Sequence, residues 1–120
     1  RTAAAASRGG INLDQCFDKF VEREQLGAQE QWYCPSCKNH LAPIKKFDIW
    51  AAPDVLIIHL KRFQYIPGTY FVHREKISDL IDFPVDELDL RNYVIGPQPT
   101  DAPPIYELYA VSEHSGGLGL

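Results

Sequence analysis

The most informative stretch of this 120-residue chain reads Val55-Leu56-Ile57-Ile58-His59-Leu60-Lys61-Arg62-Phe63. Its four leading apolar residues are typical of a strand buried on both faces. The basic and mixed residues that follow indicate that the strand leaves the core and ends at a rim where a partner can bind. We therefore predict a strand over residues 55–63, with His59 packed near the edge of the core.

The bulk properties predict one globular domain and argue against two classes of partner. The chain is 45% hydrophobic and 23% charged, and a chain of this length should bury roughly 65% of its unfolded surface. Its net charge of −4 argues against nucleic acid, whose binders usually carry a basic excess. No apolar run approaches the ~20 residues that cross a bilayer. We expect neither nucleic acid nor a membrane as partner.

Three features together predict an intracellular fragment of a longer protein. Residues 1–10 are of low complexity, which predicts a linker or the end of an insertion, and the chain contains no methionine. It has three cysteines, whereas a secreted disulfide scaffold usually has an even and larger number. A reducing compartment, the cytoplasm or the nucleus, is therefore expected.

The pattern of apolar residues predicts an α+β fold with one N-terminal helix and a mostly antiparallel sheet. Residues 12–26 have a helical period, with Asn12 and Gln15 as a capping box and Gly27 as the stop. One face of this helix is apolar and consists of Leu13, Cys16, Phe17, Phe20 and Val21. Cys16 is therefore interpreted as a small core residue of low reactivity. Further strands are expected at about residues 44–50, 71–74, 76–83 and 106–114.

Two cysteines in the stretch Cys34-Pro35-Ser36-Cys37 form a candidate metal site. Two thiolates separated by two residues at a tight turn can both face one tetrahedral Zn²⁺, and the flanking residues predict a hairpin that carries this turn. A closed structural site has four ligands, so we predict that Cys34 and Cys37 are half of a zinc site whose other half lies upstream. Completion by His40 or another histidine, a turn that has lost its metal, and a redox pair stay open as alternatives.

The remaining polar residues have plain structural interpretations. The pairs Lys45-Lys46 and Lys61-Arg62 are expected at strand edges in ion pairs, although a zinc ribbon that binds nucleic acid is a third alternative for the whole chain. His73 is expected to be solvated. His114 precedes a flexible glycine-rich run and has no paired nucleophile. Residues 96–104 hold four prolines and predict a surface loop.

Five blocks of the sequence resemble, in the same order, blocks of the ubiquitin-specific proteases, the cysteine proteases that remove ubiquitin. The stretch from His59 to Phe63 matches the His-Leu-Lys-Arg-Phe strand of that family. The blocks are a helix at residues 13–26, a zinc knuckle at 32–37 and two palm strands at 45–63. A further strand block follows at 76–90, and a final strand with its loop at 106–117. The resemblance implies a papain-like fold in which residues 11–120 form the fingers and part of the palm. It is greatest to large members whose catalytic domain is split by an insertion.

The resemblance also implies a reaction, and it implies that the catalytic residues lie in the rest of the protein. In the family a cysteine attacks the isopeptide carbonyl at the C-terminus of ubiquitin, and a histidine oriented by Asp or Asn accepts the thiol proton. The Asn-Thr-Cys and Gly-His-Tyr motifs of these two residues do not occur here. We therefore expect no catalytic residue in this chain and no activity from it alone.

What the resemblance assigns to this chain is binding. The loop that flanks the channel for the ubiquitin tail would consist of His114, Ser115, Gly116 and Gly117. The expected partners are ubiquitin and ubiquitinated proteins. We predict a fragment of a deubiquitinating enzyme that contributes ubiquitin binding and half of a structural zinc site; the alternative is a catalytically inactive ubiquitin-binding module or scaffold.

Overall fold

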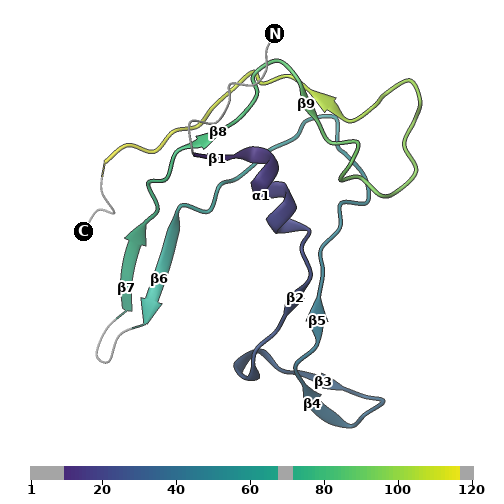
Figure 1. The fold of residues 1–120 in the computed structure, drawn as a ribbon, viewed down its shortest axis with the longest axis vertical. Coiled ribbons are helices and arrows are strands. Elements are labelled where there is room, and N and C mark those ends of the chain that lie inside the picture. The colour runs from purple at the N-terminus through teal and green to yellow at the C-terminus, as the bar shows by residue number, and fades with distance from the viewer. Residues whose placement is uncertain (1–9, 68–71, 117–120) are drawn as a thin grey trace.

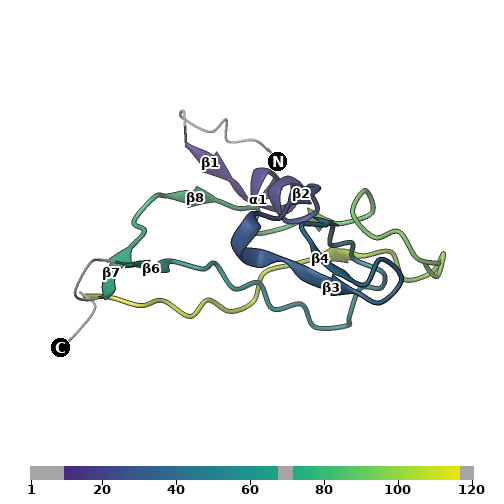
Figure 2. The ribbon, with the colours of Figure 1, turned by 90° about the horizontal axis from the view of Figure 1, so that it is seen from below.

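The computed structural model describes residues 10–67 and 72–116, which form an open and flattened molecule (Figures 1 and 2). Its extents are 51 × 43 × 26 Å and its radius of gyration is 18.6 Å, against about 14 Å for a compact chain of this length. The accessible surface is 10400 Å², against about 6,600 Å² for a compact protein of this mass. The expected burial of roughly 65% is therefore wrong, because about half of the unfolded surface is buried.

The single α-helix of the described residues, α1 (Leu13–Phe20), begins where the sequence predicts and ends earlier. The Asn12 side chain accepts from the Gln15 backbone N–H at 2.8 Å, and the Gln15 side chain accepts from the Asn12 N–H at 2.8 Å. This capping box satisfies two amides at the open end of the helix. The predicted stop at Gly27 is wrong, because the chain leaves the helix at Val21 and enters β2 (Glu24–Gln25).

The core lies where α1 meets the chain around Leu90. Leu13, Leu88, Leu90 and Val94 are buried together, and Leu90 is only 1% exposed. The Leu90 N–H donates to the Pro104 carbonyl at 2.9 Å, and the Leu90 carbonyl accepts from the Val94 N–H at 3.1 Å. The partly buried residues around this core are Cys16, Phe17, Ile49, Ala52, Leu56, Leu60, Tyr93 and Tyr106.

An arm leaves the core after α1 and returns through β5 (Ile44–Lys45), as Figure 1 shows. Its base is the antiparallel pair β2–β5, in which Glu24 lies opposite Lys45. A short 3-10 helix, η1 (Ala28–Glu30), precedes the hairpin of β3 (Trp32–Cys34) and β4 (Asn39–Leu41) at the far end. The predicted hairpin around the two cysteines is confirmed.

A second hairpin, β6 (Phe63–Pro67) and β7 (Val72–Lys76), lies apart from the arm (Figure 1). Its strands are antiparallel, with Phe63 opposite Lys76 and Gln64 opposite Glu75. Two short pairs complete the described sheets. β1 (Ile11–Asn12) pairs in parallel with β8 (Ile81–Asp82), and β9 (Leu88–Asp89) pairs antiparallel with β10 (Ile105–Tyr106).

The predicted strand over residues 55–63 is wrong except at its last residue, where β6 begins. Val55 is 58% exposed and Ile57 is 86% exposed, and His59 is exposed as well, so its predicted place at the core edge is also wrong. Leu56 and Leu60 nevertheless pack on the core. Residues 55–61 run past the core with only these two leucines, four positions apart, packed against it, and they pair with no strand among the described residues, so they form no ladder.

Other predicted strands are shorter in the structure. Of residues 44–50 only β5 is a strand, followed by an isolated parallel bridge between Ile49 and Val94. Residues 76–83 are divided between the end of β7 and β8. Of residues 106–114 only Tyr106 is in a strand, β10. The predicted strand at 71–74 is part of β7 from Val72 onward.

The fold class itself is confirmed as α+β, with one helix and small sheets of which four of the five described are antiparallel. The predicted proline-rich loop is mainly at the surface, although Gly96 and Pro104 are buried. No helix in the described ranges is both long and apolar enough to cross a membrane. Nearly all of the predicted linker, residues 1–9, lies outside the described residues.

Candidate functional site

The two cysteines of the candidate metal site lie at the turn between β3 and β4. Cys34 ends β3 opposite Asn39 of β4, and its carbonyl accepts from the Lys38 N–H at 2.7 Å. Lys38 has φ 55, the left-handed conformation that closes such a turn. The Cys37 N–H donates to the Cys34 sulfur at 3.5 Å, so both cysteines belong to one tight turn.

The polar groups of this turn favour a thiolate at Cys34. The pKa of the Cys34 thiol lies below its ordinary value, chiefly because the Cys37 N–H donates to the sulfur, with smaller contributions from the Cys37 side chain and the Ser36 N–H. A thiolate is the form that binds metals. The donor set is thus suitable for half of a tetrahedral zinc site.

His40 gives no sign of completing that site. It lies opposite Tyr33 in the β3–β4 ladder, and its ring contacts the Tyr33 ring with centroids 5.3 Å apart. Within the described ranges, no group of three or more His, Cys, Asp or Glu side chains gathers where a metal could lie. The structure therefore brings Cys34 and Cys37 together, and the described part of the chain places no third metal ligand beside them.

The second candidate site is the loop that begins at His114, and it lies against the β6–β7 hairpin. The His114 ring contacts the Phe63 ring edge-on, with centroids 5.4 Å apart and an interplanar angle of 89°. The Lys76 ammonium donates to the Gly116 carbonyl at 2.9 Å. Ser115 lies between these two contacts and is exposed. Gly117, the last predicted residue of this loop, lies outside the described residues.

The base of the β6–β7 hairpin is held by further hydrogen bonds. The Ile77 N–H donates to the Arg62 carbonyl at 2.5 Å, and the Arg62 guanidinium donates to the Asp79 carbonyl. Residues 62 and 63 are thus tied to residues 76–79 beside the loop. The sequence predicts an ion pair for Arg62, whereas its described partner is the backbone carbonyl of Asp79.

The other predicted ion pairs are present at the base of the arm. Lys45 pairs with Glu24 at 3.5 Å, and Lys46 pairs with Asp48. Both pairs are substantially exposed, so each stabilises the fold by about 1 kcal/mol at most. The structural interpretation of the pair Lys45-Lys46 is confirmed.

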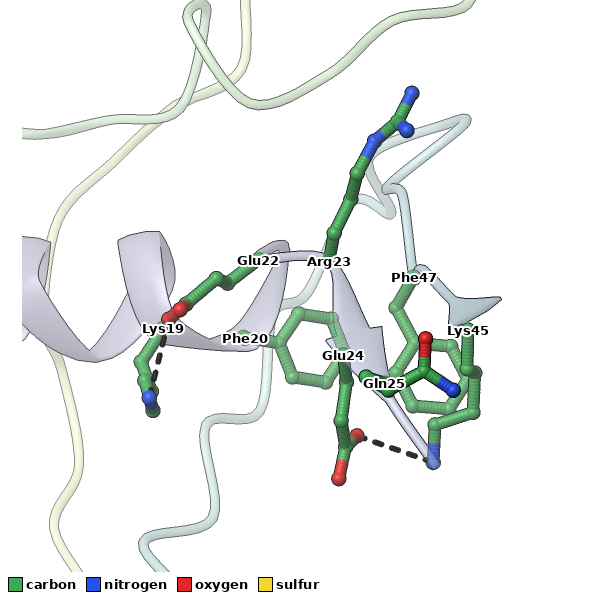
Figure 3. Close-up of a pocket in the computed structure, with 8 residues that line it drawn as sticks. All are labelled: Lys19, Phe20, Glu22, Arg23, Glu24, Gln25, Lys45 and Phe47. Carbon is green, nitrogen blue, oxygen red and sulfur yellow. Dashed lines mark ion pairs between the residues drawn. The ribbon is translucent and has the colours of Figure 1, made fainter. Parts of the chain in front are cut away.

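A hollow of about 430 Å³ lies between the end of α1 and the base of the arm (Figure 3). The rings of Phe20 and Phe47 stack with centroids 5.5 Å apart, and the Lys45 ammonium lies 5.0 Å from the centre of the Phe47 ring. Figure 3 also shows the pairs Lys19–Glu22, at 3.1 Å, and Lys45–Glu24. The lining contains no cysteine, serine, threonine or histidine, and its lysines and glutamates are in ion pairs, so it has the character of a contact surface with paired charges.

Apart from His40, which shares the β3–β4 hairpin with Cys34 and Cys37, the described cysteines and histidines lie on separate parts of the fold. Cys16 is half-buried on α1 against the core, which confirms its interpretation as a packing residue. Cys34 and Cys37 lie at the end of the arm, and His114 lies against the second hairpin. The His73 side chain is outside what the structure describes. No hydrogen bond in the described ranges joins a cysteine to a histidine, as a catalytic dyad would require.

Two residues that contact the loop are not predicted as site residues from the sequence. The sequence pattern predicts Phe63 only as the end of a strand and Lys76 only as the start of one. Neither position carries a sequence signal for contact with a loop 40 or more residues away, because that contact depends on how the hairpin folds back. The one local signal is Gly116, whose φ of +99° is a conformation that favours glycine.

Comparison with known proteins identifies the class to which this fold and these motifs belong. The family model of ubiquitin carboxyl-terminal hydrolases matches residues 17–119. Ubiquitin carboxyl-terminal hydrolase 15 of Homo sapiens is 44% identical over 109 residues, which are 91% of this chain and 10% of that protein. Ubiquitin carboxyl-terminal hydrolase 19 of Homo sapiens is 46% identical over 114 residues, 95% of this chain and 8% of that protein.

A solved structure agrees with the sequence matches. It is described as the SAGA Ubp8/Sgf11/Sus1/Sgf73 DUB module bound to ubiquitin aldehyde. It matches with a TM-score of 0.56 and 28% identity over 83% of this chain and 22% of the matched chain. The chain therefore belongs to the ubiquitin carboxyl-terminal hydrolases, and the resemblance to the ubiquitin-specific proteases is confirmed. It spans about a tenth of the length of these curated relatives.

Proposed function

We propose that the protein containing this chain is a deubiquitinating enzyme, a cysteine-type hydrolase that cleaves isopeptide bonds at the C-terminus of ubiquitin. The observation that carries this proposal is the match of residues 17–119 to the ubiquitin carboxyl-terminal hydrolase model. Residues 11–120 would be the fingers and part of the palm. The nucleophile, the general base and its orienting residue would be supplied by other parts of the protein.

In this proposal the chain's own task is to hold ubiquitin and ubiquitinated proteins. The loop of His114, Ser115 and Gly116, with Gly117 beyond it, would flank the extended ubiquitin tail. The contacts of His114 with Phe63 and of Gly116 with Lys76 support this role, because a loop held before binding loses less conformational entropy when a ligand arrives. The described part of the loop offers backbone groups and a histidine ring for an extended peptide.

The zinc proposal is separate from the binding proposal. Cys34 and Cys37 would bind one structural Zn²⁺ together with two ligands from another part of the protein. The tight turn and the lowered pKa of the Cys34 thiol support it. Bound zinc would fix the end of the arm by cross-linking it, since structural zinc contributes directly to folding free energy.

Hydrolysis of a ubiquitin reporter with a fluorescent C-terminal leaving group tests the catalytic proposal. We expect the whole protein to release the fluorophore and the purified 120-residue chain to release none. Release by the chain alone, abolished by Cys16→Ala, would mean that the chemistry resides in this segment. A whole protein that binds ubiquitin but never cleaves the reporter would support the alternative of an inactive binding module.

The alternative would hold if the rest of the protein supplied no working nucleophile and general base. Binding of ubiquitin without turnover would then be the whole function. The proposed location is the cytoplasm or the nucleus, supported by the three free cysteines, which suit a reducing compartment.

A further inference from the structure

We propose that the cross-strand pair Phe63–Lys76 is a clamp that sets the position of the loop at His114–Gly116, and that Lys76 is a positioning residue for ubiquitin binding. The inference rests on the proposed function for its link to ubiquitin. The clamp itself rests on geometry alone. Neither residue would touch the reacting atoms, so both would act through the loop.

The two contacts originate at a single register position of the hairpin. Phe63 and Lys76 are directly opposite each other in the β6–β7 ladder, and side chains of such a pair lie on the same face of the ladder. Phe63 contacts the His114 ring at one end of the loop, and Lys76 donates to the Gly116 carbonyl at the other. One pair of opposed residues therefore holds both ends of the described loop.

Hydrogen bonds hold the β6–β7 hairpin next to the pair Phe63–Lys76. The Ile77 N–H bonds to the Arg62 carbonyl at 2.5 Å, and the Arg62 guanidinium bonds to the Asp79 carbonyl. Both bonds lie immediately next to the clamp pair, on the side of the ladder away from the hairpin turn. Lys76 itself is half-buried, whereas its hydrogen bond to the Gly116 carbonyl is exposed, so the bond contributes only an ordinary net free energy.

The acceptor in the loop is suited to this contact. Gly116 has φ +99°, and no heavy atom outside its chain neighbours lies within 4 Å of the position where a Cβ would be. The left-handed backbone at Gly116, rather than crowding, is therefore what calls for glycine. The Gly116 carbonyl accepts from Lys76, and among the contacts of the described residues, losing the ammonium would leave the loop held by the Phe63–His114 contact.

The adjacent register position offers a matched control. Gln64 and Glu75 form a cross-strand hydrogen bond of 2.8 Å, one residue along from the clamp pair. Successive residues of a strand point to opposite faces, so this pair lies on the face away from the clamp pair. Glu75→Ala removes a cross-strand contact from the same hairpin while leaving both loop contacts in place.

The experiment compares Lys76→Met, Lys76→Arg, Phe63→Leu and Glu75→Ala in the whole protein, with steady-state hydrolysis of the ubiquitin reporter. We expect Lys76→Met to raise KM about threefold to tenfold, the factor that one hydrogen bond of ordinary net strength is worth, with kcat within twofold of wild type. Phe63→Leu should raise KM in the same way. Lys76→Arg should restore KM, since a guanidinium also donates to a single carbonyl, and Glu75→Ala should leave it unchanged.

A second readout, hydrogen exchange of peptides covering residues 107–116, needs no catalysis. Lys76→Met should accelerate exchange in the loop, whereas Glu75→Ala should not. An unchanged KM and unchanged exchange in Lys76→Met would overturn the clamp, as would an equal effect of Glu75→Ala. If the wild-type protein neither binds nor cleaves ubiquitin, the proposed function fails, and the exchange comparison alone decides whether the clamp exists.

Discussion

The ring of His114 lies edge-on against the ring of Phe63, with centroids 5.4 Å apart. This contact joins the last residue of the stretch Val55 to Phe63 to the loop at His114. The resemblance to the ubiquitin-specific proteases assigns that loop to the ubiquitin tail. Neither residue is in the buried core. The contact therefore depends on the β6–β7 hairpin, which brings the Phe63 ring against a loop that is distant in the sequence.

The hydroxyl of Tyr93 ties α1 to the segment beside Leu90. It donates to the Asp18 carboxylate at 2.8 Å and lies 3.2 Å from the Asp14 carbonyl. Tyr93→Phe keeps the ring stacked on Phe17 and removes these contacts. We expect a loss of about 1 kcal/mol in the free energy of unfolding, measured by urea denaturation, and no comparable loss in Tyr109→Phe, whose side chain is 82% exposed.

The same hydroxyl predicts a loss of stability in alkali. Burial, followed by the hydrogen bond to Asp18, raises the pKa of Tyr93 to about 12, above the ordinary tyrosine value of about 10. Below pH 10 the hydroxyl is protonated in both states, and its contribution is fully present. As the pH rises from 10 to about 12 the unfolded state loses its proton first, so the contribution is lost. The decline over this window should be shallower in Tyr93→Phe, and equal slopes would contradict the assignment.

The capping box of α1 can be tested at Asn12. Asn12→Ala removes the acceptor for the Gln15 N–H, so we expect a loss of about 1 kcal/mol in the free energy of unfolding. Asn12→Ser keeps an acceptor and should retain most of the stability. If Ala and Ser variants unfold at the same denaturant concentration, the side chain of Asn12 does not cap the helix.

Gly96 is expected to tolerate no side chain because it packs against Trp50. A Cβ at Gly96 would meet the Trp50 carbonyl oxygen at 2.3 Å and the Trp50 ring at 2.8 Å. Gly96→Ala should therefore cost about 1–3 kcal/mol, seen as a lower midpoint of thermal or urea unfolding. Gly27→Ala is the matched control, since no atom lies within 4 Å of its Cβ position. Similar losses in both variants would show that general backbone effects, and not contact with Trp50, are responsible.

The proposed zinc half-site predicts a selective loss of metal. Elemental analysis of the whole protein should find zinc in the wild type and in Cys16→Ser, and a markedly lower content in Cys34→Ser and Cys37→Ser. The reason is that a closed site binds poorly once one of its four ligands is removed. Zinc that persists in both arm variants would place the metal elsewhere, and a wild type without zinc would show that this turn is metal-free.

Local features were predictable and long-range ones were not. The capping box at Asn12 and the hairpin around Cys34 and Cys37 depend on residues within a few positions of one another. The helix α1 ends earlier than its sequence predicts because Glu24 and Gln25 pair with β5, a contact that overrides the helical period of residues 21–26. The apolar stretch from Val55 to Ile58 predicts a strand and forms none, because apolar residues form a strand only where a neighbouring strand supplies the ladder.

The amino-acid sequence alone was enough for the family, the fold class, the start of the helix and the paired cysteines, because motifs and local hydrogen bonds carry that information. The tertiary structure alone decided that the molecule is open, that the stretch after Val55 forms no ladder within the described ranges, and that Lys76 reaches Gly116 across 40 positions. The physical reason is that such contacts depend on the path of the whole backbone, which no local pattern encodes.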